Sequence, residues 1–284
     1  MHIIKHVEKG DKMIYINNEY KNGLKDCCFV FDFDRTITSS NSVTSWKAIE
    51  ISEKIGKDYI VNSDNLYKIY REIEINYNLD FNYRRKKMLE WVKKQILALN
   101  KYNISEETFD AVINQKGVID FKKGIYELFS FANKNNIPII IVSAGVGNII
   151  KNSLYQKGYL LDNIYIFSNN IIYEDSLFKI DGPIITSMEK ESIFLPNHLK
   201  CFRNLLVFGD QIEDINVSKN FCYENLYSIG FLTDDTGSKK DTYMQYFDAV
   251  CTDDEDYHNI LNMLFNMEEV YENKSNQKTK KWKI

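Results

Sequence analysis

Proline, glycine and cysteine are scarce in this chain, and long apolar runs are absent. Of the 284 residues, 3 are proline, 12 are glycine and 5 are cysteine. They are scattered, so the sequence has no low-complexity linker, and no segment repeats another. The longest apolar runs, such as IPIIIV at 137–142, fall far short of the roughly 20 residues that a membrane-spanning helix needs. We therefore expect no membrane partner and no array of linked repeats.

The charge balance excludes a second class of protein. The formal net charge is −4, with 44% hydrophobic and 27% charged residues, which is an ordinary soluble composition. We expect no nucleic-acid partner, because such proteins carry an excess of basic residues. Charges interrupt residues 1–12 too early for the apolar core of a signal peptide, so we expect a cytoplasmic protein. The sequence leaves the oligomeric state open.

Cysteine and histidine give little support for a zinc site. No two cysteines have the CxxC spacing, and we expect all five to be buried, reduced thiols. His2 and His6 are four residues apart, a spacing that suits a metal on a helix, but zinc is not otherwise indicated. The cysteines are Cys27, Cys28, Cys201, Cys222 and Cys251.

The first part of the chain predicts one strand followed by a block of helices. Residues 26–33, DCCFVFDF, form a short apolar run without helical spacing, which is typical of a buried parallel strand. Residues 42–115 contain no convincing strand. Ser105, followed by two glutamates, predicts the start of a helix over 105–113. Apolar residues at spacings of three and four predict further helices within 42–56, 65–77 and 83–99.

Strands and helices alternate after Gly117, which predicts a doubly wound α/β sheet. We therefore expect an α/β core formed by residues 1–41 and 115–284, with an all-helical cap domain, residues 42–114, inserted after the first strand. The polar, basic tail 272–284 is expected to fray. The predicted strands are 137–142, 163–169, 170–175, 176–182, 204–210, 225–230 and 248–251, and the predicted helices are 121–136, 148–158, 215–220, 239–247 and 257–267.

The motif FDFDRT, residues 31–36, is the strongest chemical signal. Asp32 and Asp34 end a buried strand, and side chains two apart in a strand point the same way. Both carboxylates can therefore face the crevice at the carboxyl ends of the strands, where α/β sheets bind ligands. Two acids placed there repel each other unless a cation offsets their charge. The alternative is an ordinary strand end that enters a polar turn.

Two further segments repeat this placement of polar residues after an apolar run. Ser143 follows the apolar run IPIIIV, and the small residues Ala144 and Gly145 allow close approach of the backbone, so its hydroxyl and free N–H groups suit a phosphate. Asp210 and Asp214 follow NLLVF and can converge if a helix begins between them, which suits Mg²⁺. The alternatives are a plain turn and an acid-rich helix start.

A lysine completes the set. Lys190 lies in the loop ITSMEKES, where a lone lysine is nearly always a solvated surface charge. It is a candidate only because the first two motifs precede it in the chain and the acidic pair Asp210 and Asp214 follows it. Three of the four signals directly follow apolar strands, and a chance run of all four is improbable.

At this point the chain resembles the haloacid dehalogenase superfamily of phosphotransferases. FDFDRT is similar to its first motif, Ser143 to the second, Lys190 to the third and GDQIED, residues 209–214, to the fourth. Segments from about residue 115 to 266 look like the cytosolic 5′-nucleotidase III group, the pyrimidine 5′-nucleotidases. The cap segment before Glu90 and Trp91 is similar to the one that carries the base-recognising glutamate of that group. By spacing, that residue is Glu74; the alternative is a solvated charge on a helix flank, paired with Arg71 or with an upstream lysine.

The resemblance implies a mechanism. Asp32 attacks phosphorus and forms an aspartyl-phosphate, and Asp34 protonates the leaving oxygen and later activates water. Thr36 helps to fix the turn. Ser143, Ala144 and Lys190 hold the phosphoryl oxygens. The metal ion is Mg²⁺, with Asp32, the main-chain carbonyl of Asp34, Asp210 and Asp214 as its site residues.

The resemblance also suggests a substrate, a small-molecule phosphomonoester. A nucleoside 5′-monophosphate, with a pyrimidine base preferred, is the leading class, with Glu74 as the substrate-binding residue. The alternatives are another small phosphomonoester, such as a sugar phosphate or phosphoserine, or a catalytically silent phosphate-binding module. Three departures bear on the base: Gln95 and Ile96 replace the Ser-His pair of the group, Gln211 replaces a serine, and the loop after the first motif is shorter.

Overall fold

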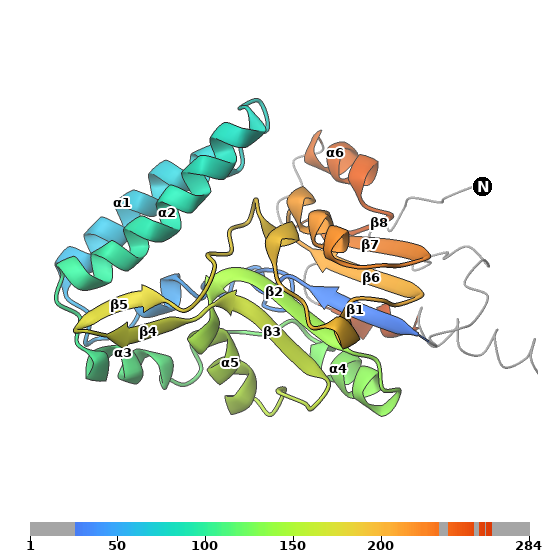
Figure 1. Cartoon of the computed structure of the whole chain (residues 1–284), viewed down its shortest axis with the longest axis horizontal. Coiled ribbons are helices and arrows are strands. Elements are labelled where there is room, and N and C mark those ends of the chain that lie inside the picture. The colour runs from blue at the N-terminus through green and yellow to red at the C-terminus, as the bar shows by residue number, and fades with distance from the viewer. Residues whose placement is uncertain (1–25, 233–237, 253–255, 259, 263–284) are drawn as a thin grey trace, which may run out of the picture.

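The computed structural model describes residues 26–232, 238–252, 256–258 and 260–262. Within these ranges the chain forms an α/β core, and a pair of long helices stands apart from its sheet (Figure 1). His2, His6, the tail 272–284 and much of the predicted helix 257–267 lie outside the described residues. None of the described helices is long and apolar enough to cross a membrane.

The core is a six-stranded sheet in which all strands are parallel. The chain places two strands on one side of the first strand and three on the other, so the order of addition reverses at the first strand. Ligands of doubly wound sheets bind at such a reversal, outside the carboxyl ends of the strands. The predicted fold class is therefore confirmed. In spatial order the strands are β3 (Ile164–Asn169), β2 (Ile139–Val146), β1 (Cys27–Phe31), β6 (Asn204–Gly209), β7 (Asn225–Phe231) and β8 (Ala249–Cys251).

Strand β1 is apolar throughout because both faces of the sheet are covered. Phe29 and Phe31 contribute to the larger core, which α4 and α5 complete, whereas Cys28 and Val30 contribute to the core on the opposite face. Short 3-10 helices and loops cover that second face. The covering elements include α4 (Ile125–Lys134), α5 (Gly147–Gln156), η2 (Lys190–Ser192), η3 (Asn197–Leu199) and η4 (Ile212–Asn220), and α6 (Ser238–Tyr246) packs at the β8 edge.

Three of the four helices expected between residues 42 and 115 are present. Residues 42–115, all of them described, contain no strand. They contain α1 (Lys57–Glu74) and α2 (Phe81–Lys101), which pack side by side, and α3 (Glu106–Ile113), which Ser105 caps. The expected helix within 42–56 is wrong: only one 3-10 turn, η1 (Lys47–Ile49), forms there. Ala48 and Ile49 of this stretch are buried in the larger core, so tertiary packing overrides the helical spacing.

Helix α3 lies apart from the other two cap helices. It packs against α5 and η1, on the side of the molecule away from α1 and α2 (Figure 1). The hairpin of β4 (Ile171–Glu174) and β5 (Leu177–Ile180) lies between them and contacts α2. Asp175 and Ser176, both with positive φ, form its turn. The domain boundaries at 42 and 114 stay a prediction.

Three local predictions differ from the structure. The helix expected from 121 begins only at Ile125, after Gly124 adopts φ 74° close against His258. The helix expected at 215–220 is part of the longer 3-10 helix η4. The prediction of five buried thiols is wrong for Cys201 and Cys222, which are free but exposed, and Cys251 is only partly buried. They lie just before β6 and β7, and the isolated backbone β-bridge that pairs these two residues lies at the surface.

Candidate active site

Two catalytic candidates are brought together by strand pairing. Strands β1 and β6 are adjacent and parallel, with Phe31 opposite Phe208. The N–H of Asp32 donates to the carbonyl of Phe208 at 2.9 Å, so Asp32 leaves β1 beside the residues that follow β6. Asp210 lies just beyond β6 at the same edge. Sheet register therefore places these carboxylates next to each other, although 178 positions separate them in the numbering of the chain.

The turn after β1 holds Asp34 through a residue that the sequence did not reveal. The N–H and the hydroxyl of Ser45 donate to the two carboxylate oxygens of Asp34, at 2.9 and 3.0 Å. Ser45 is fully buried, and its hydroxyl also accepts from the N–H of Val146 in β2 at 3.1 Å. Burial raises the pKa of Asp34, against the opposing effect of these bonds. A raised pKa favours the protonated form, which a general acid needs.

A different threonine from the expected one fixes this turn. Arg35 has φ 67°, and its N–H donates to the hydroxyl of Thr38 at 2.7 Å. The buried hydroxyl of Thr36 has no hydrogen-bond partner among the described residues, while its carbonyl accepts from the Tyr257 hydroxyl at 2.8 Å. The side-chain role expected for Thr36 therefore belongs to Thr38.

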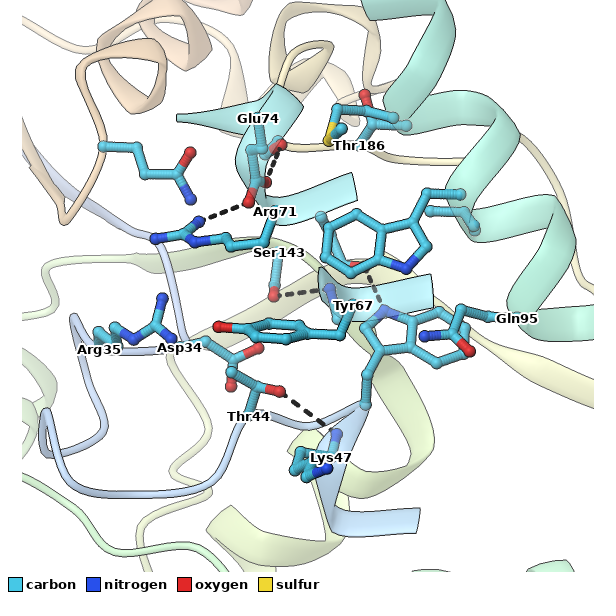
Figure 2. Close-up of a pocket in the computed structure, with 18 of the residues that line it drawn as sticks. Asp34, Arg35, Thr44, Lys47, Tyr67, Arg71, Glu74, Gln95, Ser143 and Thr186 are labelled. Carbon is cyan, nitrogen blue, oxygen red and sulfur yellow. Dashed lines mark hydrogen bonds and ion pairs between the residues drawn. The ribbon is translucent and has the colours of Figure 1, made fainter. Parts of the chain in front are cut away.

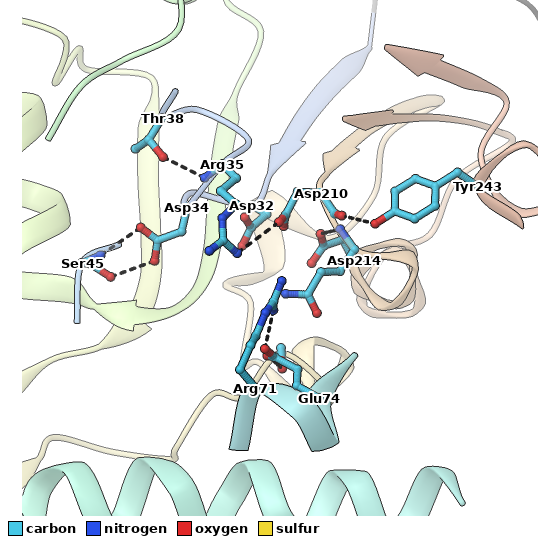
Figure 3. Close-up of polar contacts among 12 residues, drawn as sticks. Asp32, Asp34, Arg35, Thr38, Ser45, Arg71, Glu74, Asp210, Asp214 and Tyr243 are labelled. Carbon is cyan, nitrogen blue, oxygen red and sulfur yellow. Dashed lines mark hydrogen bonds and ion pairs between the residues drawn. The ribbon is translucent and has the colours of Figure 1, made fainter. Parts of the chain in front are cut away.

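Three carboxylates meet at the mouth of the turn. Ligand oxygens of Asp32, Asp210 and Asp214 lie within 4.8 Å of one another (Figure 3). Helix η4 begins between Asp210 and Asp214, as the spacing required, and the N–H of Gln211 donates to Asp214 at 2.9 Å. Gly209 is needed for this packing, since a Cβ there would lie 2.4 Å from that of Asp214. Asp34 points away from this cluster toward Ser45.

Lys190 is buried in the cluster and is not the solvated lysine of the alternative reading. Its ammonium group contacts Asp32 and lies 2.7 Å from Asp214. Burial works against the charged ammonium, but Asp214 and Asp32 outweigh it and raise the pKa of Lys190. Asn220 positions the segment by donating to the Lys190 carbonyl at 2.8 Å.

The electrostatics of the three acids fit a hard divalent cation. Burial is the first cause that raises the pKa of Asp210, and repulsion by Asp32 and Asp214 adds to it. Burial also raises the pKa of Asp214 to about 6, with Lys190 opposing the shift. Charge on three converging carboxylates is offset by one ammonium and by Arg35, whose guanidinium is 4.0 Å from Asp210. A divalent ion with oxygen ligands would relieve the remaining repulsion.

The second motif lies at an irregularity of β2. The pairing of β2 with β3 shifts register between Val142 and Val146, so Ser143 and Ala144 lie where the regular ladder is interrupted. Ser143 is buried, and its hydroxyl accepts from the N–H of Gly145 at 3.0 Å. Gly145 permits the close approach that was expected, because a Cβ there would lie 2.0 Å from the Ser45 hydroxyl.

Asn169 is a second residue that the sequence did not reveal. It is fully buried at the end of β3 and donates to the carbonyls of Ala144 and Ile185, both at 2.8 Å. The side-chain oxygen of Asn169 accepts from the N–H of Ile185 at 2.9 Å. One side chain thus ties the backbone of the Ser143 segment to the loop that leads to Lys190.

A cavity of about 500 Å³ extends from these residues to the cap. Asp32, Asp34, Ser143 and Lys190 line its floor. Figure 2 shows Tyr67 reaching across the middle of the cavity. The remaining wall comes from the segment between β1 and α1, from α1, from α2, from β2 and from the loop before η2. It includes Trp46, Lys47, Glu50, Ser63, Asp64, Lys68, Arg71, Glu74, Met88, Trp91, Gln95, Ala144, Thr186 and Ser187.

Glu74 lines this cavity but does not stand free in it. It is only 6% exposed, and one carboxylate oxygen accepts from the Ser187 hydroxyl at 2.6 Å. The other pairs with Arg71, one turn earlier on α1 (Figure 3). The sequence raised this pairing as part of a solvated helix flank; the structure shows the pair but buries the carboxylate.

Buried ion pairs connect cap and core. Arg84 of α2 pairs with Glu213 of η4 at 2.8 Å, with both side chains almost fully buried, and it also donates to the carbonyl of Glu74. The more exposed Arg85 pairs with Glu189 at 2.5 Å, next to Lys190. Nothing in the periodicity of α2 distinguishes these two arginines from its surface lysines.

Comparison with known proteins assigns the chain to a family. A model of the pyrimidine 5′-nucleotidase (UMPH-1) family matches residues 34–268. The chain belongs to this family. The chain is therefore a phosphomonoester hydrolase of the 5′-nucleotidase type. The resemblance predicted from the sequence is confirmed.

Individual relatives agree over most of their length. The chain is 26% identical over 239 residues to the 7-methylguanosine phosphate-specific 5′-nucleotidase of Gallus gallus, covering 80% of this chain and 82% of that protein. It is 25% identical over 256 residues to the protein of the same name from Drosophila melanogaster, covering 84% and 79%.

Solved structures show the same fold. Cytosolic 5′-nucleotidase IIIB bound to cytidine superposes with a TM-score of 0.73 at 24% identity, covering 87% of this chain and 88% of that one. A phosphoserine phosphohydrolase-like protein from Francisella tularensis gives 0.52 at 15% identity, covering 83% and 98%. The overall fold of this chain is therefore shared with these structures.

Proposed function

We propose that this protein is a metal-dependent 5′-nucleotidase that hydrolyses nucleoside 5′-monophosphates through an aspartyl-phosphate on Asp32. The observation that carries the proposal is the single cavity with two ends. Asp32, Asp34, Ser143 and Lys190 form an end suited to phosphoryl transfer, and cap helices form an end large enough for a nucleoside. A small phosphomonoester such as phosphoserine would leave most of the cap end unfilled.

The proposed chemistry uses two carboxylates in turn. An oxygen of Asp32 attacks phosphorus in line, and the bond from phosphorus to the ester oxygen breaks. Asp34, protonated and held by Ser45, gives its proton to the leaving oxygen. It then takes a proton from the water that attacks the aspartyl-phosphate, which releases inorganic phosphate and restores Asp32.

The remaining residues hold charge in place. The hydroxyl of Ser143, the backbone at Ala144 and the ammonium group of Lys190 face the phosphoryl oxygens and stabilise the charge they carry in the transition state. A divalent ion, with Mg²⁺ as our prediction, would supply further positive charge beside these oxygens. Asp32, the carbonyl of Asp34 and Asp210 would hold it, and Asp214 would orient that group.

The base preference is the finer part of the proposal. Pyrimidine nucleotides come first, with Glu74 as the substrate-binding residue of the cap. The named relatives add 7-methylguanosine monophosphate as a candidate, and the structure with cytidine adds cytidine monophosphate. We also keep a cytoplasmic location as a prediction, and one relative from Caenorhabditis elegans is named a putative cytosolic 5′-nucleotidase.

A substrate panel tests the proposal. It compares kcat/KM for the 5′-monophosphates of cytidine, uridine, guanosine, adenosine and 7-methylguanosine with values for glucose 6-phosphate, phosphoserine and para-nitrophenyl phosphate, with Mg²⁺ and with a chelator. We expect nucleotides, pyrimidine ones first, to exceed the other natural esters, and chelation to abolish turnover. Faster hydrolysis of phosphoserine or a sugar phosphate would favour the alternative enzyme class. No hydrolysis of any ester would favour the silent module.

A further inference from the structure

The cap end of the cavity carries no excess of negative charge. Between residues 42 and 114, three acidic and three basic side chains line it. Lys47 contacts both Glu50 and Asp64, so two of the acids share one ammonium group. The third acid, Glu74, is paired with Arg71. The remaining basic residue, Lys68, adds positive charge, so the lining from these residues has no net negative charge.

Arg71 is placed to govern what Glu74 can do. It lies one helical turn before Glu74 on α1, so both side chains project from the same face. Within the described part of the chain, Glu74 is the only hydrogen-bond partner of its guanidinium group, which has five donors. The side chain is 24% exposed, lines the cavity and lies near enough to Asp210 to act on it electrostatically. Figure 3 shows it reaching toward the carboxylate cluster.

We propose that Arg71 sets the charge selectivity of the cap end, so that this protein favours nucleotides with neutral bases and disfavours a cationic base. The inference rests on the proposed function, because it concerns which nucleotide the same site takes. A lone buried carboxylate would attract a cationic base strongly, since little water screens the pair. With Arg71 beside it, Glu74 offers hydrogen-bond acceptors without net charge, and the guanidinium repels a second cation.

The relevant contrast is between guanine and 7-methylguanine. Methylation at N7 adds one methyl group on the imidazole side, leaves the opposite edge of the base in place and puts a positive charge on the purine. The relatives named for 7-methylguanosine phosphate therefore act on a cationic base. For this chain we infer that 7-methylguanosine monophosphate is no better a substrate than guanosine monophosphate, because Arg71 neutralises the charge of Glu74.

Two variants test the inference. Arg71→Gln removes the charge and leaves Glu74 unpaired, whereas Arg71→Lys keeps a cation at the same place. The readout is the ratio of kcat/KM for 7-methylguanosine monophosphate to that for guanosine monophosphate. Because both substrates carry the same phosphate, any effect of Arg71 on the chemical step cancels in the ratio.

We expect a ratio of one or less in the wild type and in Arg71→Lys. In Arg71→Gln it should rise by about fivefold or more, the factor that about 1 kcal/mol represents. Either a wild-type ratio well above one or an unchanged ratio in Arg71→Gln would overturn the inference.

Binding of the free nucleosides keeps the two proposals separable. Thermal shifts of the wild-type protein and the variants with guanosine and with 7-methylguanosine need no turnover. If no nucleotide is hydrolysed, the proposed function fails, yet these shifts still show whether Arg71 controls the preference for charge. A larger shift with 7-methylguanosine than with guanosine in the wild type would refute Arg71 as the selector even in an active enzyme. Purity and folding of each variant are checked by its melting curve without ligand.

Discussion

The floor of the cavity and its cap end are built by different means. At the floor, Asp32 and Asp210 follow adjacent parallel strands at their carboxyl ends, so backbone pairing fixes where they lie. At the cap end, long side chains such as Arg71 reach the cavity from a helix that stands apart from the sheet. Strand ends are positioned by the ladder itself, whereas helix side chains depend on tertiary packing. We therefore expect the floor to determine whether any ester is cleaved, and the cap to determine which one.

The largest effect should come from the nucleophile. Asp32→Asn keeps the shape of the side chain but removes its charge, so we expect kcat to fall at least about a hundredfold, or about 2.7 kcal/mol of barrier. The fall should be alike for nucleotides and for para-nitrophenyl phosphate, since the floor serves both. Steady-state kinetics with both substrates measure this, and a melting curve checks folding. Retention of more than a few per cent of the wild-type kcat would sink the assignment.

The acid should show a dependence on the leaving group. Asp34→Asn cannot protonate the leaving oxygen, and loss of such proton transfer costs roughly 10²- to 10⁴-fold on a nucleotide. Para-nitrophenolate needs little protonation, so its release should suffer less. The comparison uses pre-steady-state bursts, because slow hydrolysis of the aspartyl-phosphate could mask it in steady state. Equal burst defects on both esters would count against Asp34 as the acid.

The buried lysine should matter for stability as well as for rate. Lys190→Met leaves Asp32 and Asp214 without their shared cation, and removing one partner of a buried ion pair typically costs about 3–5 kcal/mol. Lys47→Met is the matched control, because its side chain is 41% exposed and an exposed ion pair contributes about 0–1 kcal/mol. Urea unfolding in the presence of a chelator measures both. Similar losses would mean that the floor is not the tightly coupled cluster described above.

The smallest of these effects should be confined to nucleotides. Glu74→Ala removes a buried carboxylate from the cap end, and losing a charged hydrogen bond costs about 1.5–3 kcal/mol. This corresponds to roughly 10- to 150-fold in kcat/KM for a nucleotide. Para-nitrophenyl phosphate should be affected far less, since it does not reach the cap. Equal losses for both substrates, or none for either, would remove Glu74 as the substrate-binding residue.

The same contrast explains what the sequence predicted and what it did not. Strand ends such as Asp32 and Asp210 were predictable, because apolar runs mark the strands and parallel strands place their carboxyl ends at one edge. Lys190 needed the resemblance, since its loop has no periodicity. Ser45 and Asn169 could not be found, because their value lies in bonds to Asp34 and to the Ala144 carbonyl across the fold.

Periodicity failed where packing decided the local structure. The spacing within 42–56 predicted a helix, but those apolar residues bury against the core through a turn. Arg84 looks like the other basic residues of α2, and only the packing of cap on core pairs it with Glu213. The predicted burial of Cys201 and Cys222 failed for a related reason, because sequence does not show where a sheet ends.

The most direct test of the account is detection of the phosphoryl group on the enzyme. Asp34→Asn should accumulate the intermediate, because it lacks the base that activates water for its hydrolysis. The protein is mixed with para-nitrophenyl phosphate and Mg²⁺, quenched in acid, digested and analysed by mass spectrometry. We predict a phosphoryl group on Asp32, absent from an Asp32→Asn protein treated in the same way. A phosphoryl group on another residue such as Ser143, or none during a measured burst, would contradict the mechanism.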